Sequence, residues 1–177
     1  MDNLASTLRV QGDLPGARKI QEQVLDVSRR VLGDEHPDTL TRMNNLAQTL
    51  KAQGNLPGAR KIEEQVLDVS RRVLGKEHPD TLRSMNNLAH TLHAEGDLPG
   101  ARKFQEQVVD VRHRVLGEEH PDTVNSAWNL YRILSDSKDE EAAKRVFNAY
   151  LVPLLRKDPA TLSALLRQIQ SSVKDMR

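Results

Sequence analysis

Four asparagines recur along this 177-residue chain at intervals of 42 positions, as Asn3, Asn45, Asn87 and Asn129. A side-chain amide offers both a hydrogen-bond donor and an acceptor, as a peptide group does. Asparagine is also unfavourable inside helices, so its repetition in a segment of helical periodicity needs a reason. We predict that these amides form a ladder that binds the main chain of an extended ligand. The alternative interpretation is that each asparagine bonds a neighbouring helix.

The columns beside this ladder carry polar and basic residues that differ from one copy of the repeat to the next. A surface built from them would be locally positive and would favour an acidic ligand through charge-assisted hydrogen bonds. The other interpretation is that these columns are solvated helix faces that vary freely. The candidate site residues in these columns are Asn44, Asn86, Gln48, Lys51, Arg83, His90, His93, Trp128 and Arg132.

Trp128 stands at the end of the column that holds Asn44 and Asn86. An aromatic side chain at this place could anchor a ligand as an interface hot spot. We favour burial of Trp128 instead, because Tyr131 and Phe147 lie in the same divergent repeat and indicate a repacked end of the array.

No set of residues indicates catalysis or metal binding. His36, His78 and His120 precede prolines once per repeat, which indicates capping or packing at helix starts. His90 and His93 have the spacing of two ligands on one helix turn, but no third ligand or cysteine accompanies them. Nothing assembles a nucleophile, a base and an orienting group. We therefore expect no cofactor, no metal and no enzyme activity.

Two helices per repeat position these residues. Apolar residues at three- and four-residue steps predict a first helix, helix A, from Pro37 to near Gly54. Asn55 is a good N-cap, and a second apolar stripe predicts helix B from there to Gly75. All nine glycines fall into three periodic sets, one of them in the first turn of helix B, where we expect close helix approach. None is left for a phosphate-binding loop.

A fixed 42-residue period is typical of a solenoid, whose hairpins bury their apolar faces by stacking. We predict an all-α, right-handed superhelix (α-solenoid) in a single domain. The last helix has an apolar stripe with Gln168, Gln170 and Lys174 opposite it, so we expect a cap, and a partner-binding helix is the alternative. The predicted parts are a truncated repeat over 1–35, repeats over 36–77 and 78–119, a divergent repeat over 120–158 and a capping helix over 159–177.

The repeat resembles the tetratricopeptide pattern, which is carried here by Met43, Leu46, Ala47, Leu50, Ala59 and Pro79. The period is longer than the usual one of about 34 residues, which requires a longer helix B or a longer exit loop. This variant, with its Asn-Asn-Leu-Ala and Val-Leu-Gly-x-Glu-His-Pro-Asp-Thr segments, is similar to arrays of the kinesin light chain and nephrocystin-3 type.

The resemblance implies a protein-interaction scaffold. In such arrays helix A lines a concave groove that takes extended peptides, and the variable columns match its groove-lining places. One departure is that the aromatic of the family's helix B is replaced by Gln21, Glu63 and Gln105. An alternative hypothesis is a sensor or self-association array of a larger nucleotide-dependent signalling protein.

The composition bears on the class of partner. Lys and Arg number 26 against 25 Asp and Glu, which gives no argument for a nucleic acid or a membrane surface as partner. Cysteine is absent, which excludes disulfides, and the chain has neither a long apolar run nor a signal-like start. We expect a cytoplasmic protein with a protein or peptide partner, acidic in character, and no nucleic acid or membrane partner.

Overall fold

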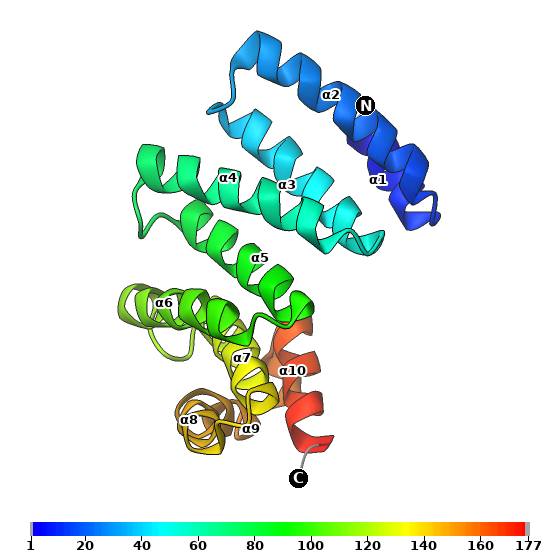
Figure 1. Ribbon diagram of the computed structural model, residues 1–177. Coiled ribbons are helices and arrows are strands. Elements are labelled where there is room, and N and C mark those ends of the chain that lie inside the picture. The colour runs from blue at the N-terminus through cyan, green and yellow to red at the C-terminus, as the bar shows by residue number, and fades with distance from the viewer. Residues whose placement is uncertain (1, 176–177) are drawn as a thin grey trace. The chain divides into compact units, whose positions relative to one another are not determined.

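The computed structural model describes residues 2–175, with side chains from Leu4 onward, and every element in this range is helical (Figure 1). The chain divides into two compact units, unit 1 (Met1–Glu95) and unit 2 (Gly96–Arg177). The boundary falls between the two helices of the predicted repeat 78–119. Unit 1 contains α1 (Asp2–Val10), α2 (Leu14–Leu32), α3 (Pro37–Ala52), α4 (Leu56–Leu74) and α5 (Pro79–Glu95). Unit 2 contains α6 (Leu98–Leu116), α7 (Pro121–Asp136), α8 (Glu140–Val146), η1 (Phe147–Leu151), α9 (Val152–Leu155), η2 (Pro159–Thr161) and α10 (Ala164–Asp175).

The predicted helical hairpins are confirmed, with α3 as a helix A and α4 as the following helix B. The α4 helix has 19 residues and α5 begins shortly after it ends, so a longer helix B accounts for the long period. Within unit 1, each helix packs mainly on the helices before and after it in the chain. This nearest-neighbour packing is the architecture of a solenoid, and the predicted all-α class is confirmed.

The prolines at the helix A starts are preceded by histidines that act as N-caps. The Nδ1 atoms of His36, His78 and His120 each accept a hydrogen bond from the backbone N–H two residues later, at 3.2, 3.2 and 3.1 Å. Each bond satisfies one of the N–H groups that a helix start leaves without an intrahelical partner. The capping role predicted for these histidines is confirmed.

The glycine in the first turn of helix B has a local role that differs from the expected close helix approach. Asn55 Oδ1 accepts a hydrogen bond from the backbone N–H of Gly58 at 3.0 Å. A Cβ atom at Gly58 would lie 2.8 Å from the amide atoms of Asn55. The glycine therefore leaves room for the capping side chain, and Asp13 with Gly16 and Asp97 with Gly100 repeat the arrangement.

The core of unit 1 forms where helix A is covered on both sides by helix B segments. Leu40 and Met43 of α3 pack in one cluster with Leu25 of α2 and Val66 of α4, and Val69 packs against this cluster. The α3 helix is thus held between two helix B neighbours, α2 and α4, which fixes the direction of its remaining face.

In unit 2 the second helix of the divergent repeat is interrupted by the π-helical segment η1. The backbone N–H of Val152 donates to the carbonyl of Phe147, five residues earlier. Pro153 follows directly, and a proline inside a regular α-helix would lack one N–H and clash with a preceding carbonyl. The wider π turn lets the chain continue helically into α9.

The last helix, α10, packs on α7 and α9. Leu166, Ile169 and Val173 bury its apolar stripe in a cluster that also contains Val124 of α7. Gln170 was predicted on the polar face, and this was wrong, because its side chain is 2% exposed. Its amide donates hydrogen bonds of 2.9 Å to the backbone carbonyls of Leu154 in α9 and of Lys157 just after it, which satisfies the buried amide N–H groups.

Candidate functional site

A pocket of about 130 Å³ lies in unit 1 where α3, α4 and α5 meet. We call it the α3–α4–α5 pocket. Its lining combines apolar side chains with polar and charged groups, as is typical of sites that bury one side chain of a ligand and orient it. The residues that argue for a site are Leu40, Thr41 and Asn44 of α3, Val66, Ser70, Val73 and Leu74 of α4, and Asp80, Arg83 and Ser84 of α5.

Asn44 is the polar group of this pocket that lacks a partner. The residue is half-buried, and its Oδ1 atom is fully buried without a hydrogen bond from any described residue. An unsatisfied buried acceptor costs about 1–3 kcal/mol. A ligand N–H would recover this cost if the Asn44 side chain turned its buried Oδ1 atom toward the pocket.

Charged residues at the edge of the pocket are held in exposed ion pairs. Arg83 Nη2 lies 3.0 Å from Asp80 Oδ1 within α5. Arg72 Nη2 donates to Glu35 Oε1 at 2.7 Å, and this hydrogen bond lowers the pKa of Glu35. Exposed pairs of this kind contribute little to stability and can exchange partners.

Lys51, a predicted groove cation, is paired with a carboxylate that lies in the interior. Its Nζ atom is 3.0 Å from Oε1 of Glu63, whose side chain is 1% exposed. Burial raises the pKa of Glu63, and the Thr91 hydroxyl and the Lys51 ammonium offset this only in part, because they favour the charged form. Oε2 of Glu63 has no hydrogen-bond partner among the described residues.

Two of the three positions where the family aromatic is replaced connect helix B to the next helix A. Gln105 Nε2 donates to the backbone carbonyl of Ser126 at 3.0 Å, and Gln21 Nε2 to that of Asn45 at 3.4 Å. Sequence reasoning noted the replacement but did not predict this tether. The available signal was a polar column on the otherwise apolar stripe of helix B.

The asparagines of the predicted ladder differ in exposure. In unit 1, Asn45 is exposed and Asn87 is half-buried. In unit 2, Asn129 is only 7% exposed. The side chain of Asn3 lies outside the described residues. Binding of a peptide main chain by the ladder stays a prediction, and the unit 1 members are the better placed for it.

The other predicted residues also divide between the two units. In unit 1, Gln48 accepts a hydrogen bond from Arg9 at 2.9 Å. In unit 2, Arg132 is exposed, whereas Trp128 packs against the cluster that contains α10 and stacks on Tyr131 with ring centroids 5.8 Å apart. The remaining residues, half-buried in unit 1, are Asn86, His90 and His93.

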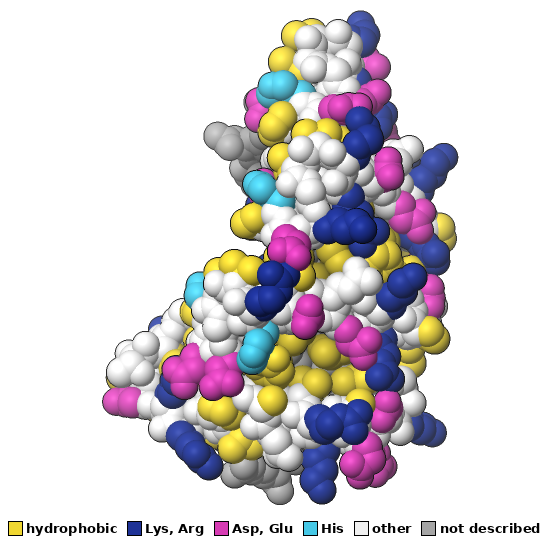
Figure 2. Space-filling view, turned by 90° about the vertical axis from the view of Figure 1, so that its left-hand side faces the viewer, with side chains coloured by type: hydrophobic (Ala, Val, Ile, Leu, Met, Phe, Trp, Pro, Cys, Tyr) yellow, Lys and Arg dark blue, Asp and Glu magenta, His cyan; other side chains and the backbone are white. Residues whose placement is uncertain are grey.

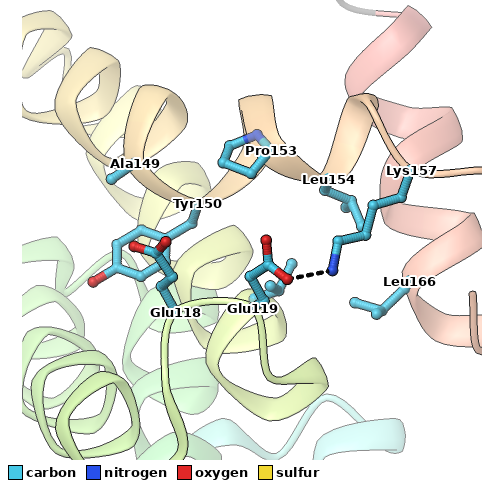
Figure 3. A pocket seen from close by; sticks show the side chains of 9 residues that line it. Glu118, Glu119, Ala149, Tyr150, Pro153, Leu154, Lys157 and Leu166 are labelled. Carbon is cyan, nitrogen blue, oxygen red and sulfur yellow. Dashed lines mark hydrogen bonds and ion pairs between the residues drawn. The ribbon is translucent and has the colours of Figure 1, made fainter.

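A second hollow, in unit 2, is too small for a ligand side chain. Its volume is about 10 Å³. That is room for a single water molecule. Glu119 and Lys157 form a 2.8 Å ion pair across it, and Tyr150 and Leu166 line it from either side (Figure 3). It therefore gives no second candidate site.

The surface charges are mixed. Figure 2 shows one face of the molecule, over which Lys and Arg side chains alternate with Asp and Glu and do not gather into one patch. Within the described residues, no three His, Asp or Glu side chains gather in a way that could hold a metal ion. A helix long and apolar enough to cross a membrane does not occur between residues 2 and 175.

Comparisons with known proteins agree with this architecture. Tetratricopeptide repeat models match residues 1–72 and 81–122. No curated protein sequence matches the chain. A crystal structure of nearly identical TPR-like repeats from a candidate kinesin light chain of Podosopora anserina is similar, with 25% identity and a TM-score of 0.81 over 98% of this chain and 85% of that one.

Two more distant structures share the fold alone. BtubC (BKLC) from P. vanneervenii has 19% identity and a TM-score of 0.75, over 97% of this chain and 62% of that one. The apo form of RapI has 10% identity and a TM-score of 0.72, over 98% and 55%. Tetratricopeptide repeats generally mediate protein–protein interaction, and their fold is typically non-enzymatic. The chain belongs to the tetratricopeptide repeat family, as an array of 42-residue repeats of the kinesin light chain type.

Proposed function

We propose that this chain is a protein-interaction scaffold that holds an extended peptide segment across the helix A faces of α3 and α5 in unit 1. The observation that carries this proposal is the α3–α4–α5 pocket with the partnerless acceptor of Asn44. An apolar side chain of the peptide would fill the pocket, while the Asn44 side chain would turn its Oδ1 atom outward to accept from a main-chain N–H. The amides of Asn45 and Asn87 would bind further main-chain groups.

The second part of the proposal is that the bound segment is acidic. The cations that support it are Arg83, Lys51 and Arg9, all on helix A segments of unit 1. Two of them already form ion pairs, but a guanidinium has five N–H donors and an ammonium three, so each keeps donors for a ligand. Acidic residues on either side of the apolar anchor would use these donors.

The test is an array of immobilised peptides probed with the intact chain at two salt concentrations. We expect retention of peptides that combine an apolar residue with neighbouring acids, and weaker retention at the higher salt concentration. Retention of neutral or basic peptides alone, insensitive to salt, would refute the acidic part of the proposal.

The retained peptide then tests the pocket itself by titration against variants. Asn44→Ala removes the acceptor and is expected to weaken binding by about tenfold, the equivalent of one hydrogen bond to a buried group. Gln65→Ala, which removes an exposed amide from α4 of the same unit, is the matched control. Equal affinities of the two folded variants would place the peptide elsewhere on the molecule.

A further inference from the structure

One repeat position on helix B changes from a small hydroxyl side chain to a cation. Ser28 of α2 and Ser70 of α4 occupy this position in the first two copies, and Arg112 of α6 occupies it in the third. Ser70 is buried and lines the α3–α4–α5 pocket in unit 1. Arg112, in unit 2, is half-buried. The chemistry that a hairpin offers at this position therefore differs between the repeats.

The guanidinium of Arg112 is anchored to the first turn of α7 through one nitrogen atom. Its Nη1 donates hydrogen bonds to the backbone carbonyl of Asp122 at 3.0 Å and to Oγ of Ser126 at 2.6 Å. The Ser126 side chain is buried and itself donates to the Asp122 carbonyl at 2.8 Å. These bonds hold Arg112 in one orientation and leave its Nε and Nη2 atoms without a hydrogen bond to any described residue.

The charge of Arg112 has no close counter-charge. Among the described residues, no carboxylate lies within ion-pair distance of this guanidinium, whereas Arg102 of the same helix pairs with Glu106 at 2.7 Å and Asp139 at 2.8 Å. Burial lowers the pKa of Arg112, and the more distant charge of Asp122 offsets this only in part. A cation that is partly removed from water is normally paired, so a carboxylate from outside the chain would supply what is missing.

Exposed apolar side chains lie beside this cation. Val115 and Leu116 follow Arg112 by three and four residues on α6, which places them on the same helix face. Val115 is 60% exposed and Leu116 is 42% exposed. A ligand that pairs with Arg112 can therefore also cover apolar surface. This combination favours an acidic residue with an apolar neighbour.

We propose that Arg112, Val115 and Leu116 form a carboxylate-binding site in unit 2 for an Asp or Glu side chain of a partner protein, with an apolar residue next to it. The Nε and Nη2 atoms form the edge of a guanidinium that binds a carboxylate through two parallel hydrogen bonds. Binding there leaves both Nη1 bonds intact. The site goes beyond the proposed function, which concerns the α3–α4–α5 pocket of unit 1, and neither proposal rests on the other.

The test is an NMR titration of the intact chain with the dipeptide Leu-Glu, acetylated and amidated so that its only charge is the glutamate side chain. We expect saturable shifts of the Arg112 Nε–H resonance and of the backbone amides of Val115 and Leu116. Leu-Gln, which replaces the carboxylate by an amide, should bind about tenfold more weakly, because charge-assisted hydrogen bonds are lost. Raising the salt concentration should weaken the binding of Leu-Glu.

Three variants make the test specific. Arg112→Ser restores the side chain of the two preceding repeats and should abolish the saturable shift of the Val115 amide. Arg112→Lys keeps the charge but cannot form two parallel bonds, so it should weaken binding by about tenfold. Arg167→Gln, which removes an exposed cation from α10 of the same unit, should leave binding unchanged.

Two results would overturn the proposal. Without a saturable shift from Leu-Glu, or with equal affinities for Leu-Glu and Leu-Gln, Arg112 would be only a structural link between α6 and α7. Tighter binding of inorganic phosphate than of Leu-Glu at the same resonances would assign the site to phosphorylated ligands instead.

Discussion

Glu63 occupies the repeat position that holds a glutamine in the neighbouring repeats. When it is ionised, its carboxylate cannot donate the hydrogen bond that each glutamine donates. Gln21 and Gln105 donate amide N–H groups to backbone carbonyls of the following helix A. A carboxylate has only acceptors, so Glu63 instead pairs with Lys51 of its own hairpin, and its Oε2 has no hydrogen-bond partner in the part of the chain that the structure describes. Burial raises its pKa, which means that the folded state disfavours the charged form.

Glu63→Gln is expected to stabilise the protein near neutral pH. Because the folded-state pKa is raised above the unfolded value, the contribution of Glu63 to stability is greatest below the unfolded pKa and decreases as pH rises through the folded pKa. The variant lacks this loss and should gain about 1 kcal/mol in unfolding free energy near pH 7, with little gain near pH 4. Denaturant titrations across this range measure the difference.

The control for this prediction is Glu64→Gln, which removes the neighbouring carboxylate. Glu64 is exposed and its Oε1 atom lies 2.8 Å from Nε of Arg60. Replacement of an exposed partner should change stability by only a few tenths of a kcal/mol at any pH in this range. A Glu63→Gln variant that is less stable than the wild type near pH 7 would contradict the assignment of Glu63 as a net cost.

For single residues, the sequence predicted contacts within one segment better than contacts between helices. The capping histidines follow from local spacing, because His36 and the N–H that it binds are only two residues apart. Lys51 was assigned to the groove without its partner Glu63, since that contact joins two columns on different helices. The partnerless acceptor of Asn44 also requires the packing of three helices, which no single segment encodes.

At the level of single helices, Asn55 and Gly58 act as one unit at the start of α4. Asn55→Ala removes the cap and should cost about 1 kcal/mol. Gly58→Ala in the wild type adds a methyl group 2.8 Å from the capping side chain. Its gain in helix propensity is therefore offset by displacement of the cap. In the Asn55→Ala background the same change should stabilise by about 0.5–1 kcal/mol.

The measurement is a double-mutant cycle on unfolding free energies. We expect a coupling of about 1 kcal/mol between the two positions, because they share one hydrogen bond. Additive effects would show that Gly58 has its role in helix packing, as the sequence first indicated.

Gly75 ends α4 in a backbone conformation with φ 92° and ψ 164°. This region is essentially restricted to glycine. Gly75→Ala should therefore cost about 1–3 kcal/mol even though no atom lies within 4 Å of the added methyl group. Denaturant unfolding measures this cost, with the exposed mid-helix change Gln65→Ala as a reference expected within about 0.5 kcal/mol of the wild type. A loss no larger than that of the reference would exclude backbone strain.

The extent of each element was predictable where the repeat is regular and less so where it diverges. The period, the caps and the apolar stripes defined α3 and α4 because each of these signals is local. The π segment η1 and the inward turn of Gln170 depend on how the end of the array packs, and the sequence marked this region only as a divergent, aromatic-rich repeat. The same end packing places Trp128 beside α10.

At the scale of the whole molecule, the repeat period predicted the solenoid because each hairpin packs mainly on its neighbours. The division between Glu95 and Gly96 was not predicted. Gly96 has counterparts at Gly12 and Gly54, and the repeat sequence gives no sign that one of these turns separates two units. Such a boundary depends on the sum of contacts on either side and not on the residues that form the turn.

The net charge of +1 means that long-range steering contributes little, so any preference for acidic peptides must come from cations at the site. Arg83→Gln is therefore expected to weaken the binding of an acidic peptide by about tenfold at low salt, because one charge-assisted hydrogen bond is lost. The difference from wild type should shrink as salt is raised, because screening already weakens the wild-type contact. Arg30→Gln, which removes an exposed cation paired with Asp26 on α2, should leave the affinity and its salt dependence unchanged. The measurement is a titration of the peptide against both variants at several salt concentrations. Equal losses of affinity for the two variants would indicate a general charge effect and no site at Arg83.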